Sequence, residues 1–196
     1  MLARLTSWFP FLLLAGLAAL TFWLDRMVQL APGAPQALSR HDPDYMVDKL
    51  KAARTNENGI VIYTLDAERM IHYPDDDTTH LTAPRFVSLR AKQAPVTITA
   101  REGLVSSNGE NVYFKNDVKV TRAAYADRSE MVMRTTYLHI IPDDNIARTD
   151  QPVTIQDAAA VVHAVGLELN NETRVLRLFS NVRGTYDPKL APKKGR

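Results

Sequence analysis

A run of twenty residues without a charge, from Leu5 to Leu24, is the feature that most restricts how this chain can fold. As an α-helix the run would be about 30 Å long, which matches the hydrocarbon core of a bilayer. Trp8 and Trp23 lie near its two ends, where interfacial aromatic residues are common. Pro10 falls in the first turn, where its missing N–H costs little. The run predicts a single transmembrane helix.

The flanking charges predict the orientation of this helix. Arg4 and the free amino group precede the run, whereas Asp25 and Arg26 follow it and cancel. The positive-inside rule therefore places the N-terminus in the cytoplasm and the rest of the chain outside. This makes the chain a single-pass membrane protein.

A cleaved signal peptide is the competing interpretation. Small residues in the segment 30–34 could suit a signal peptidase. However, the apolar run is longer than the hydrophobic region of a typical signal peptide, and Pro32 and Pro35 are unfavourable near a cleavage site. We favour an uncleaved anchor.

Small residues gather on one face of the predicted helix. Ala15, Gly16 and Ala19 are spaced three and four apart, which lets a second helix approach closely. Many apolar helices contain such residues by chance. We favour packing against a partner helix.

Composition divides the chain into four segments. Residues 1–26 form the cytoplasmic N-terminus and anchor, and residues 27–44, rich in proline, form a linker. Residues 45–188 have the length of one domain. Residues 189–196 form a flexible basic tail, in which Lys193, Lys194 and Arg196 are interpreted as solvated.

Short runs of β-branched and aromatic residues, separated by turn signals, recur after Asn58-Gly59. No long stretch has helical periodicity, so the domain is predicted to be all-β: a sandwich, barrel or jellyroll. Residues 45–54 are compatible with a short helix or an irregular lead-in. The predicted strands are 60–65, 68–73, 85–89, 96–100, 111–115, 118–122, 131–141, 153–156, 161–169, 175–179 and 182–186.

Internal similarity suggests that strand pairs stack along one interior. The pattern Val112-x-Phe114-x-x-x-Val118-x-Val120 recurs 64 residues later, from Leu176 to Gly184, and Pro-Val-Thr-Ile occurs twice. Alternate side chains of a strand face the same side. The residues predicted to face inward are Val96, Ile98, Ala100, Leu138, Ile140, Val153, Ile155, Leu167, Leu169, Leu176 and Leu178.

The sequence gives no sign of catalysis. It lacks cysteine, a nucleophile elbow, a zinc-protease motif and a phosphate-binding glycine loop. His72, Asp75, Asp76, Asp77 and His80 could hold a divalent ion, but we favour a polar hairpin loop. The net charge of +2 argues against nucleic-acid binding. We predict no enzyme activity, no cofactor and no metal.

The order of helix, proline-containing linker and repetitive β domain resembles the LptC family of lipopolysaccharide export proteins. The closest stretches are Val96-Thr-Ile-Thr-Ala-Arg-Glu-Gly, Val112-Tyr-Phe-Lys-Asn-Asp-Val-Lys-Val, Gly166-Leu-Glu-Leu-Asn-Asn and Val182-Arg-Gly-Thr-Tyr-Asp. The resemblance implies an elongated periplasmic β-jellyroll with an apolar interior. It further implies that lipopolysaccharide arrives from an inner-membrane ATP-binding-cassette (ABC) transporter and leaves to a soluble periplasmic bridge protein of LptA type.

The resemblance also implies site residues. Leu81, Leu176 and Tyr186 fall at lipid-facing positions of the family, although each could be plain core. Strand alternation adds Ile98, Phe114, Ile140 and Leu178 to the predicted lipid-binding set. Val182, Arg183 and Gly184 lie on the last strand, which is predicted to dock the bridge protein. Gly166, at a family glycine, indicates close backbone packing or a bulge.

Two other functions compete with lipid transport. An envelope adaptor would need no lipid contact, and an envelope hydrolase would carry an unrecognised site. Lipid cross-linking separates transport from the adaptor, and a turnover assay would reveal a hydrolase.

Overall fold

The computed structural model describes residues 8–28, 41–89, 93–126, 128–142 and 144–190. The chain forms two compact units, Met1–Arg40 and His41–Arg196. The possible cleavage segment, most of the predicted linker and the cluster Lys193, Lys194 and Arg196 lie outside the described residues.

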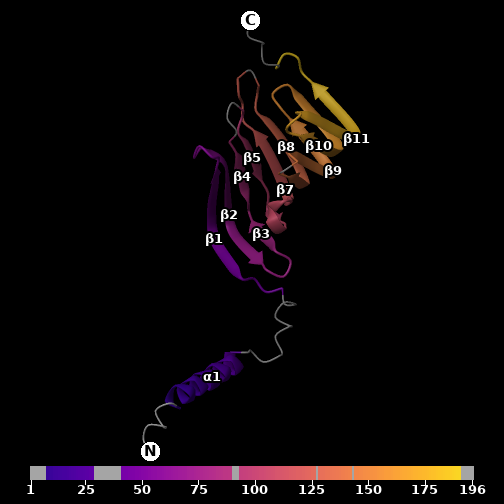
Figure 1. Ribbon diagram of the computed structural model, residues 1–196. Coiled ribbons are helices and arrows are strands. Elements are labelled where there is room, and N and C mark those ends of the chain that lie inside the picture. The colour runs from indigo at the N-terminus through magenta and orange to yellow at the C-terminus, as the bar shows by residue number, and fades with distance from the viewer. Residues whose placement is uncertain (1–7, 29–40, 90–92, 127, 143, 191–196) are drawn as a thin grey trace, which may run out of the picture. The chain divides into compact units, whose positions relative to one another are not determined.

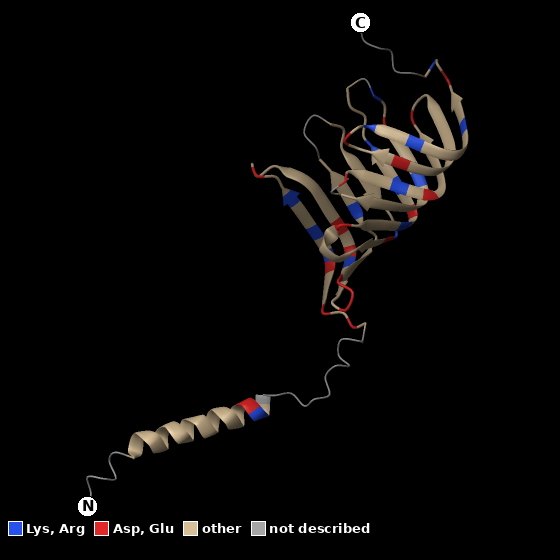
Figure 2. Cartoon of the chain, turned by 45° about the vertical axis from the view of Figure 1, so that its right-hand side comes forward, with Lys and Arg blue, Asp and Glu red and all other residues tan. Residues whose placement is uncertain are grey.

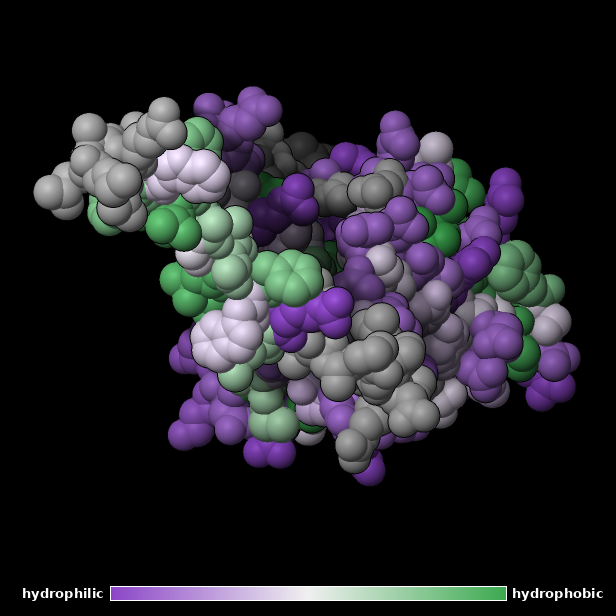
Figure 3. Space-filling view, turned by 60° about the horizontal axis from the view of Figure 1, so that its bottom comes forward, coloured by the Kyte–Doolittle hydropathy of each residue, from purple (hydrophilic) through white to green (hydrophobic). Residues whose placement is uncertain are grey.

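One helix, α1, extends from Phe9 to Val28 (Figure 1). Its residues Phe9–Met27 are long and apolar enough to cross a membrane. The described side chains of α1 are exposed, and the helix surface in view is largely hydrophobic (Figure 3). A soluble helix would bury such a surface in a core, so this one suits a lipid environment.

The second unit is built from antiparallel strands that form one sheet (Figure 1). A short 3-10 segment, η3 (Ser107–Gly109), lies between two of the strands. The strands are β1 (Tyr45–Thr55), β2 (Val61–Tyr73), β3 (Thr78–Thr82), β4 (Arg85–Ser88), β5 (Val96–Thr99), β6 (Glu102–Val105), β7 (Val112–Arg122), β8 (Met131–Ile141), β9 (Ile146–Gln156), β10 (Ala160–Asn170) and β11 (Val175–Tyr186).

Most predicted strands lie within these elements, but in several cases two predicted strands are parts of one longer strand. The segments 60–65 and 68–73 both belong to β2, and the same holds for the two halves of β7 and of β11. The prediction missed β3, β6 and the first half of β9. It was also wrong for residues 45–54, which belong to strand β1. The residues of β1 have no strong strand pattern, and pairing with β2 along nearly its whole length decides the conformation.

The sheet is a meander in which neighbours along the chain are neighbours in space. β3 and β4 lie end to end along β2 and pair with it in one common register. Arg69 is opposite Thr82, and Asp66 is opposite Arg85. β5 and β6 continue one another in the same way, against β4 and β3. β7 to β11 then follow in order. β1 and β11 are the two edges of the sheet.

Bulges interrupt the strands near their middles. The register shifts once within each of the pairs β7–β8, β8–β9, β9–β10 and β10–β11. Left-handed residues lie at or beside these shifts: Asn116 (φ 62°), Asp117 (φ 56°), Gly166 (φ 81°) and Asn181 (φ 51°). Asparagine, aspartate and glycine adopt this conformation at the lowest cost. A bulge bends its strand, so this line of bulges folds the sheet across the middle of its strands.

The core lies between the two halves of the folded sheet. It combines Phe114 and Leu138 from one side of the bulge line with Val120 and Met133 from the other. The strand ends and their turns therefore form the two rims of a trough. Acidic residues gather at the rim where β1 begins and β2 turns into β3 (Figure 2).

Candidate functional site

Two rows of paired residues cross the inner face of the sheet, one on each side of the bulge line. The first apolar row begins at Val47 on edge strand β1 and ends at Leu178 on edge strand β11. Cross-strand neighbours on one face lie close enough to pack directly. Its members are Val47, Met70, Leu81, Gly103, Phe114, Leu138, Thr149, Leu167 and Leu178.

The second apolar row runs from β1 to β11 through an unbroken series of residue pairs, passing through β4 and β5 rather than β3 and β6. It contains no charged or polar side chain. Its members are Ala52, Leu65, Phe86, Ile98, Val120, Met133, Ile155, Val162 and Gly184. The two rows together give the trough an apolar lining along its whole length.

Burial changes along the trough. In the middle, Phe114 and Leu138 are 2% and 1% exposed. On the edge strands, inward residues are open, and Leu176 is 45% exposed. The lining is therefore a packed core in the centre and an uncovered apolar surface at both ends.

The residues predicted to bind lipid divide along the same gradient. Leu81, Ile98 and Phe114 are buried, and Ile140 and Leu178 pack partly buried against the core. Leu176 and Tyr186 are exposed on β11. All seven lie at positions that face the inside of the trough. Ile140 and Leu176 belong to a further row of cross-strand pairs beside the first apolar row. Tyr186 lies two residues after Gly184 and therefore faces the same side.

Sequence reasoning missed several lining residues. Ala164 belongs to the core, and so do Val118 and Val120, which were noted only in the repeat. In β10 the alternation changes phase at the Gly166 bulge, which conceals Ala164. In β7, Val118 and Val120 keep the alternation of Phe114, so simple alternation was the available signal.

Gly166 serves both of its predicted roles. It lies at the register shift of β10 with a φ of 81°. A Cβ at this position would lie 2.8 Å from Cδ2 of Phe179 on the neighbouring strand. The ring therefore covers a bulge that only glycine fits without strain.

The last strand, β11, pairs with β10, and among the described residues no strand pairs with its other edge. The predicted partner-binding residues Val182, Arg183 and Gly184 are all exposed there. Arg183 pairs with His163 and has outward phase, whereas Val182 and Gly184 have inward phase. A free edge with exposed apolar side chains is a surface to which another strand can add.

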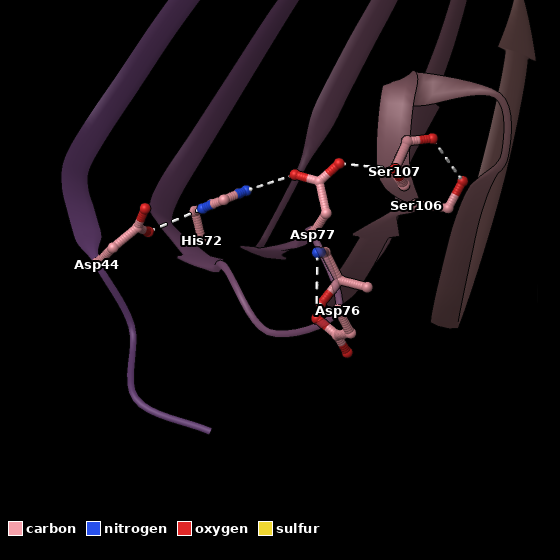
Figure 4. Close-up of polar contacts among 7 residues, drawn as sticks. Asp44, His72, Asp76, Asp77, Ser106 and Ser107 are labelled. Carbon is pink, nitrogen blue, oxygen red and sulfur yellow. Dashed lines mark hydrogen bonds and ion pairs between the residues drawn. The ribbon is translucent and has the colours of Figure 1, made fainter. Parts of the chain in front are cut away.

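A chain of polar contacts closes the acidic rim at the β1 end (Figure 4). His72 lies between two carboxylates: its Nδ1 is 2.7 Å from Asp44 and its Nε2 is 3.1 Å from Asp77. Ser107 of η3 donates to the second oxygen of Asp77 at 2.6 Å. Tyr45 stacks on the imidazole with ring centroids 4.6 Å apart. The chain ties the start of β1, the β2–β3 turn and η3 to one another.

These contacts favour a protonated His72. Hydrogen bonds to the side chains of Asp44 and Asp77 raise the pKa of His72. The pKa of Asp77 is lowered, mainly by hydrogen bonds from Ser107 and His72. The pKa of Asp76 is lowered by a hydrogen bond from Thr78. The rim is therefore held by charge-assisted hydrogen bonds, which are stronger than neutral ones.

A second histidine, His139 on β8, is held neutral. Burial and, to a lesser extent, the Arg148 charge lower the pKa of His139. Arg148 Nε donates to its Nδ1 at 3.2 Å, which leaves Nε2–H to donate to Asn111 Oδ1 at 2.7 Å. Tyr113 stacks on the ring at 4.5 Å. This group sits on the outer face of the sheet and does not line the trough.

The β2–β3 hairpin also brings His41, Asp75 and Asp76 close together, with candidate ligand atoms within 4.8 Å of one another. His41 Nδ1 lies 3.0 Å from Asp75, and its ring stacks on Tyr73. All three candidate ligands are solvent-exposed. These contacts occupy the side chains without an ion, in line with a polar hairpin loop.

On α1, the predicted packing residues Ala15, Gly16 and Ala19 leave a shallow face. A Cβ added at Gly16 would meet nothing within 4 Å. The face therefore has room for another helix, the arrangement favoured by small residues in membranes.

Comparison with known proteins identifies this architecture. The family model described as lipopolysaccharide-assembly, LptC-related, matches residues 11–187. No curated protein matches the chain significantly. Among solved structures, LptH is similar; it is the LptA-homologous periplasmic component of the lipopolysaccharide transport device of Pseudomonas aeruginosa. The two share 6% identity with a TM-score of 0.52, over 64% of this chain and 95% of LptH.

Proposed function

Because this chain belongs to the LptC-related family and functions in lipopolysaccharide transport, we propose that its β domain carries the lipid between two partners. It receives lipopolysaccharide from an inner-membrane ABC transporter. It then passes the lipid to a soluble periplasmic bridge protein of LptA type. The domain carries the lipid without chemical change and needs no cofactor or metal.

The observation that carries this proposal is the pair of apolar rows that cross the sheet from one edge to the other. Burying one CH₂ group is worth about 0.8 kcal/mol, so exposing an acyl chain of about a dozen carbons would cost on the order of 10 kcal/mol. A multi-chain lipid therefore needs an apolar path across water. The uncovered inward side chains at β1 and β11 offer places to enter and leave it.

The helix α1 holds the domain at the membrane. An uncleaved anchor with a cytoplasmic N-terminus keeps the domain on the periplasmic side, where residues 27–44 act as the linker and 189–196 as the tail. The face of Ala15, Gly16 and Ala19 packs against helices of the transporter. This arrangement would keep the β1 end of the trough close to the source of lipid.

The two free edges suit partners of the same fold. β11 docks the bridge protein through backbone hydrogen bonds, and the N-terminal end of the domain docks the transporter. Joining edge strands would extend both apolar rows into the partner. Lipid could then pass without leaving an apolar surface.

Site-specific photo-cross-linking in the membrane tests lipid carriage. A photoreactive residue at Leu176 or Leu81, both of inward phase, should capture lipopolysaccharide. Lys119, exposed between the buried Val118 and Val120, is the matched outward control and should not. Equal capture at all three positions would indicate nonspecific adsorption. Absence of capture at Leu176 and Leu81 would favour the adaptor function.

The docking edge is tested separately. Arg183→Ala should change affinity for the bridge protein little, because the contact is made by the backbone. Arg183→Pro should disrupt it, since proline removes an N–H and is poorly tolerated within a sheet. A melting curve must first show that the proline variant is folded. A folded proline variant with unchanged affinity would place the docking edge elsewhere.

A further inference from the structure

One charged side chain belongs to the inner face of the trough rather than the outer face. Arg122 is the last residue of β7 and has the phase of Val118 and Val120, which are 1% and 9% exposed. Its cross-strand neighbours are Val96 and Met131, both partly buried and apolar. The guanidinium is therefore attached at the rim of the apolar lining.

The guanidinium is poorly satisfied by the protein. Its Nη2 donates to the carbonyl of Ser129 at 3.3 Å, while its Nε is buried without a hydrogen-bond partner. Within the described ranges, no carboxylate forms an ion pair with Arg122. A buried guanidinium N–H without a hydrogen-bond partner is unfavourable, so an added acceptor such as an anion would stabilise it.

Two carboxylates lie at the opposite rim. There, the row that includes Tyr45, His72 and Leu176 ends beside Asp44 and Asp77. These two carboxylates disfavour an anionic headgroup beside them, whereas the Arg122 guanidinium would attract one. The two rims thus distinguish the two ways in which a charged lipid could lie in the trough.

We propose that Arg122 binds a phosphate group on the headgroup of the lipid while its acyl chains lie along the apolar rows. The guanidinium presents a planar fork of N–H donors that matches phosphate oxygens in geometry and charge. The inference rests on the proposed function and specifies how the lipid is oriented. The headgroup lies at the rim formed by the ends of β5, β7 and β8.

The test compares lipid A carrying two phosphates with lipid A from which both have been removed, each titrated against the full-length protein in detergent. Arg122→Met keeps an apolar stem and removes the charge, whereas Arg122→Lys keeps the charge without the fork. Arg134→Met is the matched control, because Arg134 lies outward on β8, between the buried Met133 and Thr135.

We expect Arg122→Met to weaken binding of the phosphorylated lipid by roughly 10-fold or more, the range for a hydrogen bond to a charged group. Binding of the phosphate-free lipid should not change. The affinity of Arg122→Lys for the phosphorylated lipid should lie between those of the wild type and Arg122→Met. Arg134→Met should bind this lipid as tightly as the wild type does. The melting temperature of Arg122→Met should stay the same or rise, because the substitution removes a buried nitrogen without a partner.

Other outcomes would overturn the inference. Equal weakening for both lipids, or a large drop in melting temperature, would make Arg122 a structural residue of the β7–β8 connection. If Arg122→Met binds the phosphorylated lipid with unchanged affinity, Arg122 does not contact the lipid. If inorganic phosphate raises the melting temperature through Arg122 but the two lipids bind alike, the site takes free phosphate instead. Failure of the wild type to bind either lipid would instead contradict the proposed function.

Discussion

The ring of Phe179 lies across Gly166 on the neighbouring strand, so a Cβ at position 166 would come within 2.8 Å of the ring. The contact joins edge strand β11 to the bulge of β10. It covers the one bulge residue of β10 that has no side chain. Edge and bulge are thereby coupled on the outer face of the sheet.

Gly166→Ala should destabilise the domain by more than a left-handed alanine alone, which costs about 1–2 kcal/mol. Gly109→Ala is the control, since Gly109 also has a positive φ of 71° but a Cβ there meets nothing within 4 Å. Urea unfolding of both variants measures the difference. The excess at position 166 should shrink in a Phe179→Ala background. An equal loss of unfolding free energy in both glycine variants would mean that the Phe179 ring moves aside at no measurable cost.

Leu138→Ala should lower the free energy of unfolding by about 2–5 kcal/mol, the usual range for a cavity in a packed core. Leu176→Ala should cost less than about 1 kcal/mol, because its side chain already faces solvent. Both substitutions remove the same atoms from the trough lining. Similar losses in chemical denaturation would show that the end of the trough is covered in solution.

The pH dependence of stability should reveal the polar contacts of His72. Its pKa is raised in the folded protein, so the stabilisation is fully present below the unfolded pKa of about 6.5. It is lost as pH rises through the folded pKa. The pKa of Asp77 is lowered, so its contribution is lost only when pH falls through that folded value. Melting temperatures of the wild type and His72→Gln should therefore differ more at mildly acidic than at alkaline pH. A constant difference would contradict this.

His139 should behave in the opposite way. Its pKa is lowered by burial and by Arg148, so the folded state favours the neutral ring. Its contribution to stability is present above the unfolded pKa and is lost as pH falls through that value to the folded pKa. Titration of the histidine ring signals by NMR should give a lower pKa for His139 than for His72. The reverse order would contradict the burial of His139 and the hydrogen bonds of His72.

The sequence predicted the fold class well because its strands carry β-branched residues and turn signals. The strand Met131–Ile141 was predicted with its observed bounds. β3 and β6 were missed because each is short and gains its partners only when the chain folds over. β1 was missed because its residues gain strand structure from pairing rather than from pattern.

The lining of the trough was only partly predictable. Ile98 and Phe114 follow simple alternation within one run and are buried as expected. The contribution of Ala164 depends on the bulge at Gly166, which local propensity alone does not locate. The pairing of His72 with Asp44 joins residues 28 positions apart and needs the register of β1 against β2. The unmatched guanidinium of Arg122 likewise becomes visible only when its neighbours are known.

The meander topology bears on how the domain assembles. Apart from β4 and β6, which continue β3 and β5, each strand pairs with the one made just before it, so no pairing waits for a distant part of the chain. Low contact order favours rapid folding, and domains tend to form from their N-terminus as they are synthesised. Once α1 is in the bilayer, β1 and β2 can form a hairpin and each later strand can add to the growing edge. β11 is the last of the described strands to add, and its outer edge then has the geometry to accept a strand from another molecule.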